Sequence, residues 1–278
     1  MRNTLALLAV LVASPAVSQV PLPHFVRANA THTLYHELAH ALIDQFSIPV
    51  LGQEEDAADN FATLEIARRF ESDAKPMLAD VAAAWLMLDA DLDRDDLDYQ
   101  GPHDLDAQRA YRAVCMYFGL APSKRRDIAD WADIPRDLRD VCTETALMTR
   151  DSWERAISDT IRSDSSPRPD VTLTFSAPGR NNVARQRLER SGILQDFVAD
   201  IRDSFAWPNP ISVTALTCDQ PNAFWDPETR TIEMCYEIID EWIIQSLRDN
   251  RTPEERFRAP SARDIAPLKP LPEKNVRN

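Results

Sequence analysis

Positive charge is scarce in this sequence of 278 residues. Lysine and arginine together number 31, against 45 aspartate and glutamate residues, so the formal net charge is −14. Proteins that bind nucleic acid neutralise phosphates with a basic face, and proteins that dock on anionic lipid use basic clusters. The composition therefore argues against both classes of partner.

Long hydrophobic runs are also missing. The run "TLALLAVLVA" at residues 4–13 has the length of a signal-peptide core and is too short to span a bilayer. Arg2 precedes it, and Ala16 and Ser18 place small residues where a signal peptidase reads. We therefore expect residues 1–18 to be a cleaved secretory signal and the protein to be periplasmic or secreted. No cysteine follows directly, so we expect no lipoprotein anchor and no stable membrane anchor.

Cysteine is sparse, and no Cys-x-x-Cys pair occurs among the four cysteines. In an exported chain an even number of cysteines favours disulfides. Four cysteines allow three pairings. We favour Cys218 with Cys235, because both fall on neighbouring expected strands, and Cys115 with Cys142. A zinc site made of all four thiolates is the alternative, and the spacings do not favour it.

The pattern of hydrophobic residues changes near a polar linker at about residue 165. Helical periodicity comes before it, and alternating strand patterns are concentrated after it. The expected helices are 29–46, 54–70, 75–90, 105–117, 143–161, 182–205 and 237–248, and the expected strands are 171–175, 211–218, 222–225 and 231–236. This organisation predicts an α+β fold, mostly helical, with a small sheet of C-terminal strands.

We expect one domain over residues 19–250, with a helical part at 19–163 and a strand-containing part at 169–250. A tail over residues 251–278 is rich in proline and charge. The aspartate-rich loop at residues 89–98 loosely resembles a calcium loop, but an arginine holds the turn-glycine position. A solvated acidic loop is the preferred interpretation.

One expected helix carries His36, Glu37 and His40 as His-Glu-x-x-His. Two histidines four residues apart lie on one helix face, so both imidazoles can reach a single tetrahedral Zn²⁺. Glu37 then projects toward the position of a water bound to that metal and can take its proton. An ordinary helix with two surface histidines is the alternative interpretation.

A hydrolytic zinc site needs a third protein ligand and one open position. The next expected helix supplies Glu55 and Asp59, and a helix hairpin would bring Glu55 beside the two histidines. Asp59, one turn later, can accept the other imidazole N–H of a ligand histidine and fix its tautomer. Glu54 is the alternative third ligand. A solvated acidic start to the helix is the alternative without a metal.

The segment "HELAHALIDQFSIPVLGQEEDAADNFA" (residues 36–62) is similar to the gluzincin pattern, in which a glutamate and an aspartate four residues later complete a zinc site. It more closely resembles a bacterial family of unknown function described as putative metallopeptidases. The resemblance extends over most of the mature chain, through "DLDAQRAYRAVCMYFG", "DVCTETALMTRDSWERAI" and "CDQPNAFWDPETRTIEMCYEII". It implies a zincin-like fold, a Zn²⁺ cofactor on His36, His40 and Glu55, and hydrolysis of a peptide or protein substrate.

The same resemblance implies further site residues. Asn222, Ala223 and Phe224 match an edge strand that receives the substrate backbone in gluzincins that process prenylated or membrane proteins, although a plain β-hairpin is equally compatible. His103 and Arg109 have the spacing of a histidine and arginine that stabilise the oxyanion in those enzymes. A loop histidine and a surface arginine are the alternative interpretation.

In gluzincins the strands precede the His-Glu-x-x-His helix, whereas here they follow it. We interpret this order as a circular permutation, which is tolerable because chain ends commonly lie close together at a domain surface. Residues 24–75 and 169–248 should then pack as one domain, with the helix at 237–248 beside the helix at 29–46.

The sequence thus predicts an exported zinc-dependent metallopeptidase. Two alternatives remain open: a non-catalytic zinc-binding or partner-binding protein on a peptidase scaffold, and a zinc hydrolase of non-peptide amides or esters. Glu37 weighs against the first alternative, because a structural zinc site needs no such carboxylate.

Overall fold

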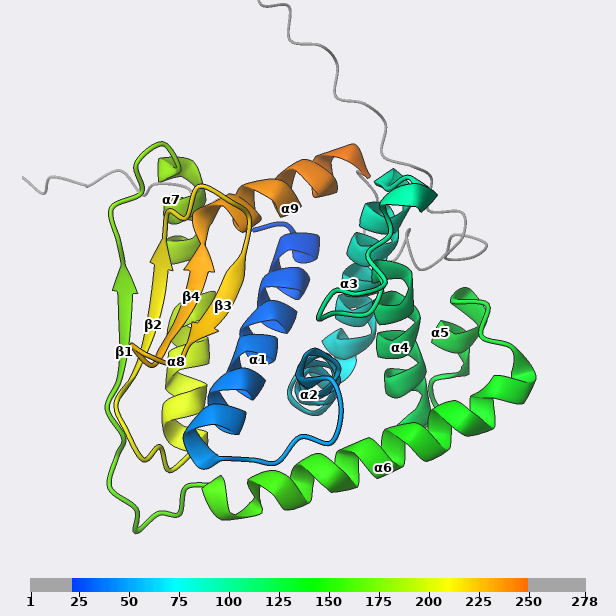
Figure 1. The fold of residues 1–278 in the computed structure, drawn as a ribbon, viewed down its shortest axis with the longest axis horizontal. Coiled ribbons are helices and arrows are strands. Elements are labelled where there is room, and N and C mark those ends of the chain that lie inside the picture. The colour runs from blue at the N-terminus through cyan, green and yellow to red at the C-terminus, as the bar shows by residue number, and fades with distance from the viewer. Residues whose placement is uncertain (1–21, 250–278) are drawn as a thin grey trace, which may run out of the picture.

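A computed structural model describes residues 22–249 of the chain (Figure 1). The expected signal peptide at 1–18 and the tail at 251–278 lie outside these residues. The described part contains helices and strands in the order α1 (His24–Phe46), α2 (Glu54–Arg69), α3 (Glu71–Asp91), α4 (Asp106–Gly119), α5 (Arg126–Trp131), α6 (Arg139–Ile157), β1 (Val171–Phe175), α7 (Asn182–Ser191), α8 (Ile193–Ser204), β2 (Ile211–Leu216), β3 (Ala223–Asp226), β4 (Thr231–Cys235) and α9 (Tyr236–Arg248), with short 3₁₀ turns at Arg94–Asp96, Arg136–Leu138 and Ser158–Thr160. The expected α+β class with a small sheet is confirmed.

The sheet has the strand order β1-β2-β4-β3. Strands β1, β2 and β4 are parallel, and β3 pairs antiparallel with β4. The parallel pairs need crossover connections, which α7 and α8 supply between β1 and β2. Strand β3 is therefore one edge of the sheet, and it contacts α1.

Helix α1 lies at the centre of the molecule, between the sheet and helices α2 and α3 (Figure 1). Its apolar residues Leu34, Leu38 and Leu42 are completely or almost completely buried. Helix α9 also contacts α1, although the two are separated by nearly the whole described chain. The helix that carries His-Glu-x-x-His is consequently held from several sides.

Several element boundaries differ from expectation. Helix α1 begins at His24 rather than at residue 29, α3 begins at Glu71 rather than at residue 75, and α6 runs four residues earlier than expected. The single helix expected at 182–205 is two helices, because Gly192 adopts a left-handed conformation with φ of 77° that ends α7. The short helix α5 was not expected.

Two disulfides join Cys115 to Cys142 and Cys218 to Cys235, the pairing favoured above. The first connects α4 to α6, and the second ties the loop after β2 to the end of β4. A four-thiolate zinc site is thereby excluded. No helix between residues 22 and 249 has the length and apolar character needed to cross a membrane.

Candidate metal centre

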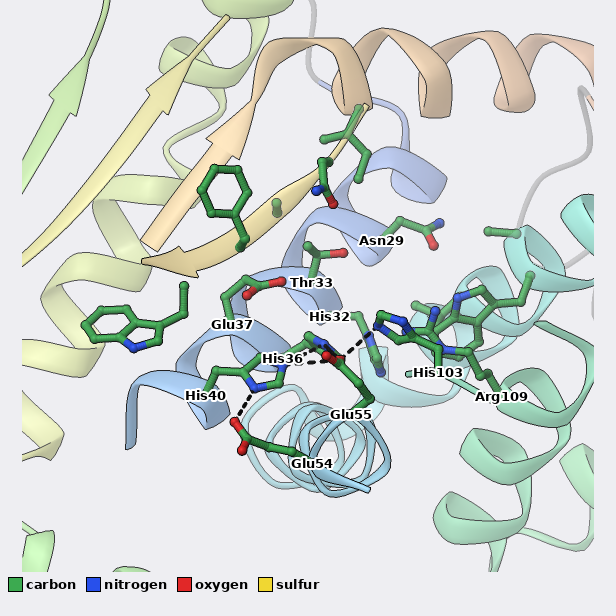
Figure 2. A pocket seen from close by; sticks show the side chains of 18 of the residues that line it. Asn29, His32, Thr33, His36, Glu37, His40, Glu54, Glu55, His103 and Arg109 are labelled. Carbon is green, nitrogen blue, oxygen red and sulfur yellow. Dashed lines mark hydrogen bonds and ion pairs between the residues drawn. The ribbon is translucent and has the colours of Figure 1, made fainter. Parts of the chain in front are cut away.

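Three side chains converge between α1 and α2 (Figure 2). His36 and His40 lie one turn apart on α1, and Glu55 lies in the first turn of α2. The Nε2 atoms of the two histidines are 3.2 Å apart, and the Glu55 Oε2 lies 3.0 Å from the His36 Nε2 and 3.2 Å from the His40 Nε2. These three atoms form a group that could hold a metal ion.

The outer ring nitrogens of both histidines also meet carboxylates. The His36 Nδ1 lies 2.8 Å from an oxygen of Asp59, and the His40 Nδ1 lies 2.8 Å from an oxygen of Glu54. Each Nδ1–H can donate to its carboxylate, which leaves the Nε2 lone pair directed inward. Glu54 therefore faces the outer side of His40, while Glu55 faces the centre of the site.

Three inward electron-pair donors this close together repel one another unless a cation neutralises them. Tetrahedral zinc with bonds of about 2.0 Å separates its ligands by about 3.3 Å, which matches the observed distances. Without a metal, a proton on the His36 ring supplies the positive charge that reduces this repulsion. Burial lowers the pKa of His36, but hydrogen bonds with Asp59 and Glu55 outweigh the burial and raise the pKa to about 9. The donor set thus fits a zinc ion.

Glu55 and Asp59, both on α2, have lowered pKa values and remain ionised. Burial would raise the pKa of Glu55, yet its contacts with His103, His36 and His40 hold the pKa far below its usual range. Burial would likewise raise the pKa of Asp59, and its bonds with His36 and Arg109 lower it strongly instead. A full negative charge makes Glu55 chemically suited to bind a cation.

Glu37 occupies the wall of the cleft next to these donors (Figure 2). Only 6 % of the residue is exposed. Burial raises the pKa of Glu37, while His36 and His40 and a backbone hydrogen bond with Trp225 of β3 oppose that rise. A carboxylate of raised pKa beside a water-accessible cleft is suited to accept and return protons.

His103 comes from the loop between α3 and α4. Its Nε2 lies 2.8 Å from the Glu55 Oε2, and its ring stacks on that of His36 with the centroids 6.0 Å apart. The side chain is 41 % exposed, so a ligand in the cleft can reach it. The structure therefore brings His103 to the predicted site, although from a loop distant in sequence.

Arg109, on α4, lines the same cleft and binds Asp59. Its Nε and one terminal nitrogen donate to the two oxygens of Asp59 at 2.8 and 2.9 Å. Its guanidinium also lies 4.6 Å from the centroid of the Trp85 ring. Buried His32 meets the same ring edge to face at 5.1 Å. Arg109, Asp59 and His36 consequently form a continuous chain of hydrogen bonds.

These donors open into a cleft of about 740 Å³. The sequence-predicted residues Ala223 and Phe224 line it from β3, and Asn222 lines it from the position just before that strand. Trp85 of α3 and Trp242 of α9 line other parts of the wall. The cleft therefore joins the metal donors, the edge strand and an apolar surface in one space of the size of a ligand pocket.

The sequence did not predict the contact of Glu54 with the outer nitrogen of His40, or the presence of Trp85 and Trp242 in the cleft wall. The sequence offers Glu54 only as an alternative ligand, because its contact with the outer nitrogen of His40 depends on the angle at which α1 and α2 cross. Trp85 and Trp242 lie on separate helices with no shared motif. A tryptophan on an amphipathic helix is more often part of the core, so no sequence signal singled them out.

A second group of potential ligands, Cys218, Cys235 and Glu237, lies at the end of β4. Its two cysteines are joined in a disulfide and carry no free thiolate. Glu237 instead accepts hydrogen bonds from the backbone of Cys218 and Asp219 and from the side chain of Asn181. This group is therefore structural.

Comparison with known protein families identifies a family for the chain. The model of a family described as "Putative metallopeptidase" matches residues 16–157 and 176–265 of the chain. No curated protein and no solved structure matches it. The family match covers both the residues of the candidate metal centre and the strands that pack beside it. The chain belongs to the putative metallopeptidase family.

Proposed function

We propose that the protein is an exported zinc-dependent peptidase of the gluzincin type, in which His36, His40 and Glu55 hold the metal. The observation that carries this proposal is the set of three donor atoms 3.0 to 3.2 Å apart, in a cleft that Glu37 also lines. The disulfides and the signal-like N-terminal sequence support export.

Bound zinc would supply a Lewis acid that polarises the scissile carbonyl and makes water more acidic. Glu37 acts as the general base: its carboxylate accepts a proton from the attacking water and passes it to the nitrogen of the leaving amine. Burial of Glu37 supports this role, because a carboxylate of raised pKa is a stronger base and accepts the proton of the water more readily.

His103 supplies a hydrogen bond to the oxyanion of the tetrahedral intermediate. Its partly exposed ring beside Glu55 supports this role. For Arg109 we propose a different role from the oxyanion stabilisation expected from the resemblance. Its guanidinium holds Asp59, and Asp59 orients His36, so Arg109 acts as a positioning residue.

The substrate backbone pairs with the free edge of β3. Asn222, Ala223 and Phe224 line the cleft, and the Trp225 backbone contacts Glu37, so a peptide added along this edge would pass the catalytic base. The resemblance to gluzincins and the position of β3 beside α1 support this arrangement, and the reversed order of strands and helix supports a circular permutation.

Glu37→Gln in the full-length protein tests the function. We expect one zinc per chain in both proteins and a loss of peptide hydrolysis of about 10²- to 10⁴-fold in the variant. Zinc is measured by mass spectrometry of the metal and hydrolysis by profiling a mixed peptide library. Glu233→Gln, on β4 and outside the residues that line the cleft, is the matched control and should cleave normally.

Two outcomes would overturn the proposal. Full hydrolytic activity in Glu37→Gln would exclude Glu37 as the base. Stoichiometric zinc without cleavage of any peptide by the wild-type protein would favour the non-catalytic alternative, or a zinc hydrolase of non-peptide amides or esters if such substrates are turned over.

A further inference from the structure

A second cleft, of about 490 Å³, lies between α2, α6 and the end of α8, and none of the metal donors lines it. Figure 1 shows α6 running along the edge of the molecule beneath α2. The cleft has an apolar lining that includes Phe61 of α2, Trp153 and Ile157 of α6, and Phe205 after α8. Its volume lies within the range of small-molecule binding pockets.

Arginine is concentrated around this apolar surface. Five arginines line the cleft, against the three acidic residues Glu65, Glu154 and Asp203. The balance is opposite to that of the whole chain, in which acidic residues outnumber basic ones by 45 to 31. A local excess of positive charge over an apolar floor is a feature that the proposed peptidase reaction does not use.

Three of the arginines have carboxylate partners. Arg68 and Arg69 both donate to Glu65, and Arg150 donates to Asp151. These pairs neutralise their charges within the protein, so they leave little attraction for an external anion.

Arg125 and Arg162 differ from these three arginines in having no carboxylate partner among residues 22–249. Arg125 donates to the backbone carbonyl of Tyr117 and lies 3.8 Å from the centroid of its ring. Arg162 donates to the carbonyl of Ser166, and its buried Nε has no hydrogen-bond partner. Within residues 22–249 neither arginine forms an ion pair. Partial burial lowers the pKa of Arg125, and no carboxylate there offsets the cost of partly desolvating that charge.

We propose that this cleft binds an anionic amphiphile, a single apolar chain with a carboxylate or phosphate head group. The chain packs on the floor formed by Phe61, Trp153 and Ile157. The head group supplies the negative charge that Arg125 and Arg162 lack, because guanidinium pairs strongly with carboxylate and phosphate. A free fatty acid and a phosphorylated single-chain lipid share this chemistry.

Calorimetric titration of the full-length, zinc-loaded protein tests the proposal. Decanoate and decyl phosphate represent the two sources of the head group. Octyl glucoside supplies a chain without charge, and inorganic phosphate supplies charge without a chain. We expect micromolar to submillimolar binding of one or both decyl anions, and at least tenfold weaker binding of the other two probes.

Three variants locate the site. The double variant Arg125→Gln/Arg162→Gln should weaken binding of the decyl anion at least tenfold, because it removes both unpaired charges. Ile161→Ser, at the cleft wall, should weaken it through the lost apolar contact; the residue is 51 % exposed, so the change is compatible with folding. Arg185→Gln, on α7 and outside the cleft lining, is the control and should bind as the wild type does.

The proposal is overturned if neither decyl anion binds at millimolar concentration. It is also overturned if inorganic phosphate binds as tightly as decyl phosphate, since the apolar floor would then contribute nothing. Unchanged binding in both the double variant and Ile161→Ser, with normal thermal unfolding, would place any observed site elsewhere. Peptide hydrolysis by the wild-type protein is measured in parallel. If hydrolysis is absent, the proposed function fails, but the binding of the decyl anion is still tested.

Discussion

Each nitrogen of the two candidate zinc-ligand histidines faces a carboxylate, and the two inner nitrogens share one. Asp59 and Glu54 face the outer nitrogens of His36 and His40, and Glu55 faces both inner ones. Such outer partners fix the tautomer and the orientation of a ligand imidazole. The position of each carboxylate therefore matters more for the orientation of the two imidazoles than the total negative charge of α2.

Substitution of Arg109 by glutamine distinguishes positioning from oxyanion stabilisation. The change removes two charge-assisted bonds to Asp59, so we expect the zinc dissociation constant to rise about tenfold. The turnover number at saturating zinc should change by only a few fold. Competition with a chromogenic chelator measures the first quantity and peptide hydrolysis the second.

Arg112→Gln is the matched control for this experiment. It lies one turn from Arg109 on α4 and pairs with Asp56 and Asp104 rather than with Asp59, so its zinc affinity should stay near that of the wild type. The opposite pattern in Arg109→Gln, normal zinc affinity with a turnover number reduced by 10² or more, would restore the oxyanion role.

The convergence of His36, His40 and Glu55 could be predicted from sequence, because helical periodicity places the two histidines on one face and a short connection returns the next helix beside them. Their binding of a metal stays a prediction. The partners of Arg109 could not be predicted in this way. Its contact with Asp59 joins α4 to α2, and the spacing of six residues from His103 says nothing about which side of the site the guanidinium enters. Tertiary packing decides that direction.

At the scale of elements, α4 and α6 approach so closely that Gly119 is required at their crossing. A Cβ on Gly119 would lie 2.2 Å from the carbonyl oxygen of Cys142 and 2.7 Å from the Cβ of Ala146. Alanine favours helix by about 1 kcal/mol over glycine. A contact of 2.2 Å with a backbone oxygen lies at the severe end of overpacking, which costs about 2–3 kcal/mol or more and so outweighs that gain.

Gly119→Ala should accordingly lower the free energy of unfolding by about 1–2 kcal/mol or more. Urea denaturation followed by circular dichroism measures the change. Gly52→Ala is the control, because no atom lies within 4 Å of the added Cβ and the stability should be nearly unchanged. A Gly119→Ala protein at least as stable as the wild type would show that α4 and α6 separate without cost.

A second contact between elements predicts a dependence on pH. His24, at the start of α1, lies 2.7 Å from Asp80 and 3.2 Å from Asp73, both on α3. The hydrogen bond with Asp80 raises the pKa of His24 above 6.5, against the opposing effect of burial. A raised folded-state pKa means that the protonated form stabilises the fold, fully below about pH 6.5, and that this stability is lost as the pH rises through the folded-state value.

We therefore expect the stability difference between wild type and His24→Gln to be largest near pH 6 and to shrink toward pH 9. Denaturation of both zinc-loaded proteins at a series of pH values measures this difference, and the subtraction removes titrations common to both. A difference that stays constant or grows with pH would contradict the assignment.

The elements themselves were largely predictable, and the exceptions have local causes. The helix expected at 182–205 divides because Gly192 permits a left-handed residue, yet a single glycine inside a helical pattern is often tolerated. The early start of α1 was missed because residues 24–28 carry no side-chain capping signal, and the structure likewise shows no side-chain cap at Pro23.

At the scale of the whole molecule, α1 depends on segments from both halves of the chain. Helices α2 and α3 contact it on one side, and β3, β4, α8 and α9 contact it on the other. Tyr35 of α1 makes part of the contact with α8: its ring packs edge to face on Phe197, and its hydroxyl donates to Asp200. Periodicity predicted one apolar stripe on α1, but only the assembled sheet explains why it is buried nearly all round.

Truncation of the chain after Ser163 tests whether α1 needs the contacts that it makes with the C-terminal half of the chain. The truncation deletes the sheet, α8 and α9, so the apolar surface of α1 that they cover becomes exposed to water. Because His36 and His40 are fixed by the burial of that helix, we expect loss of cooperative unfolding and a zinc affinity at least 100-fold weaker. A matched chain that ends at Asn250 keeps every described element and should bind zinc normally. If the shorter chain unfolded cooperatively and retained wild-type zinc affinity, α1 would need no support from the sheet, and the hypothesis of a circularly permuted peptidase domain would fail.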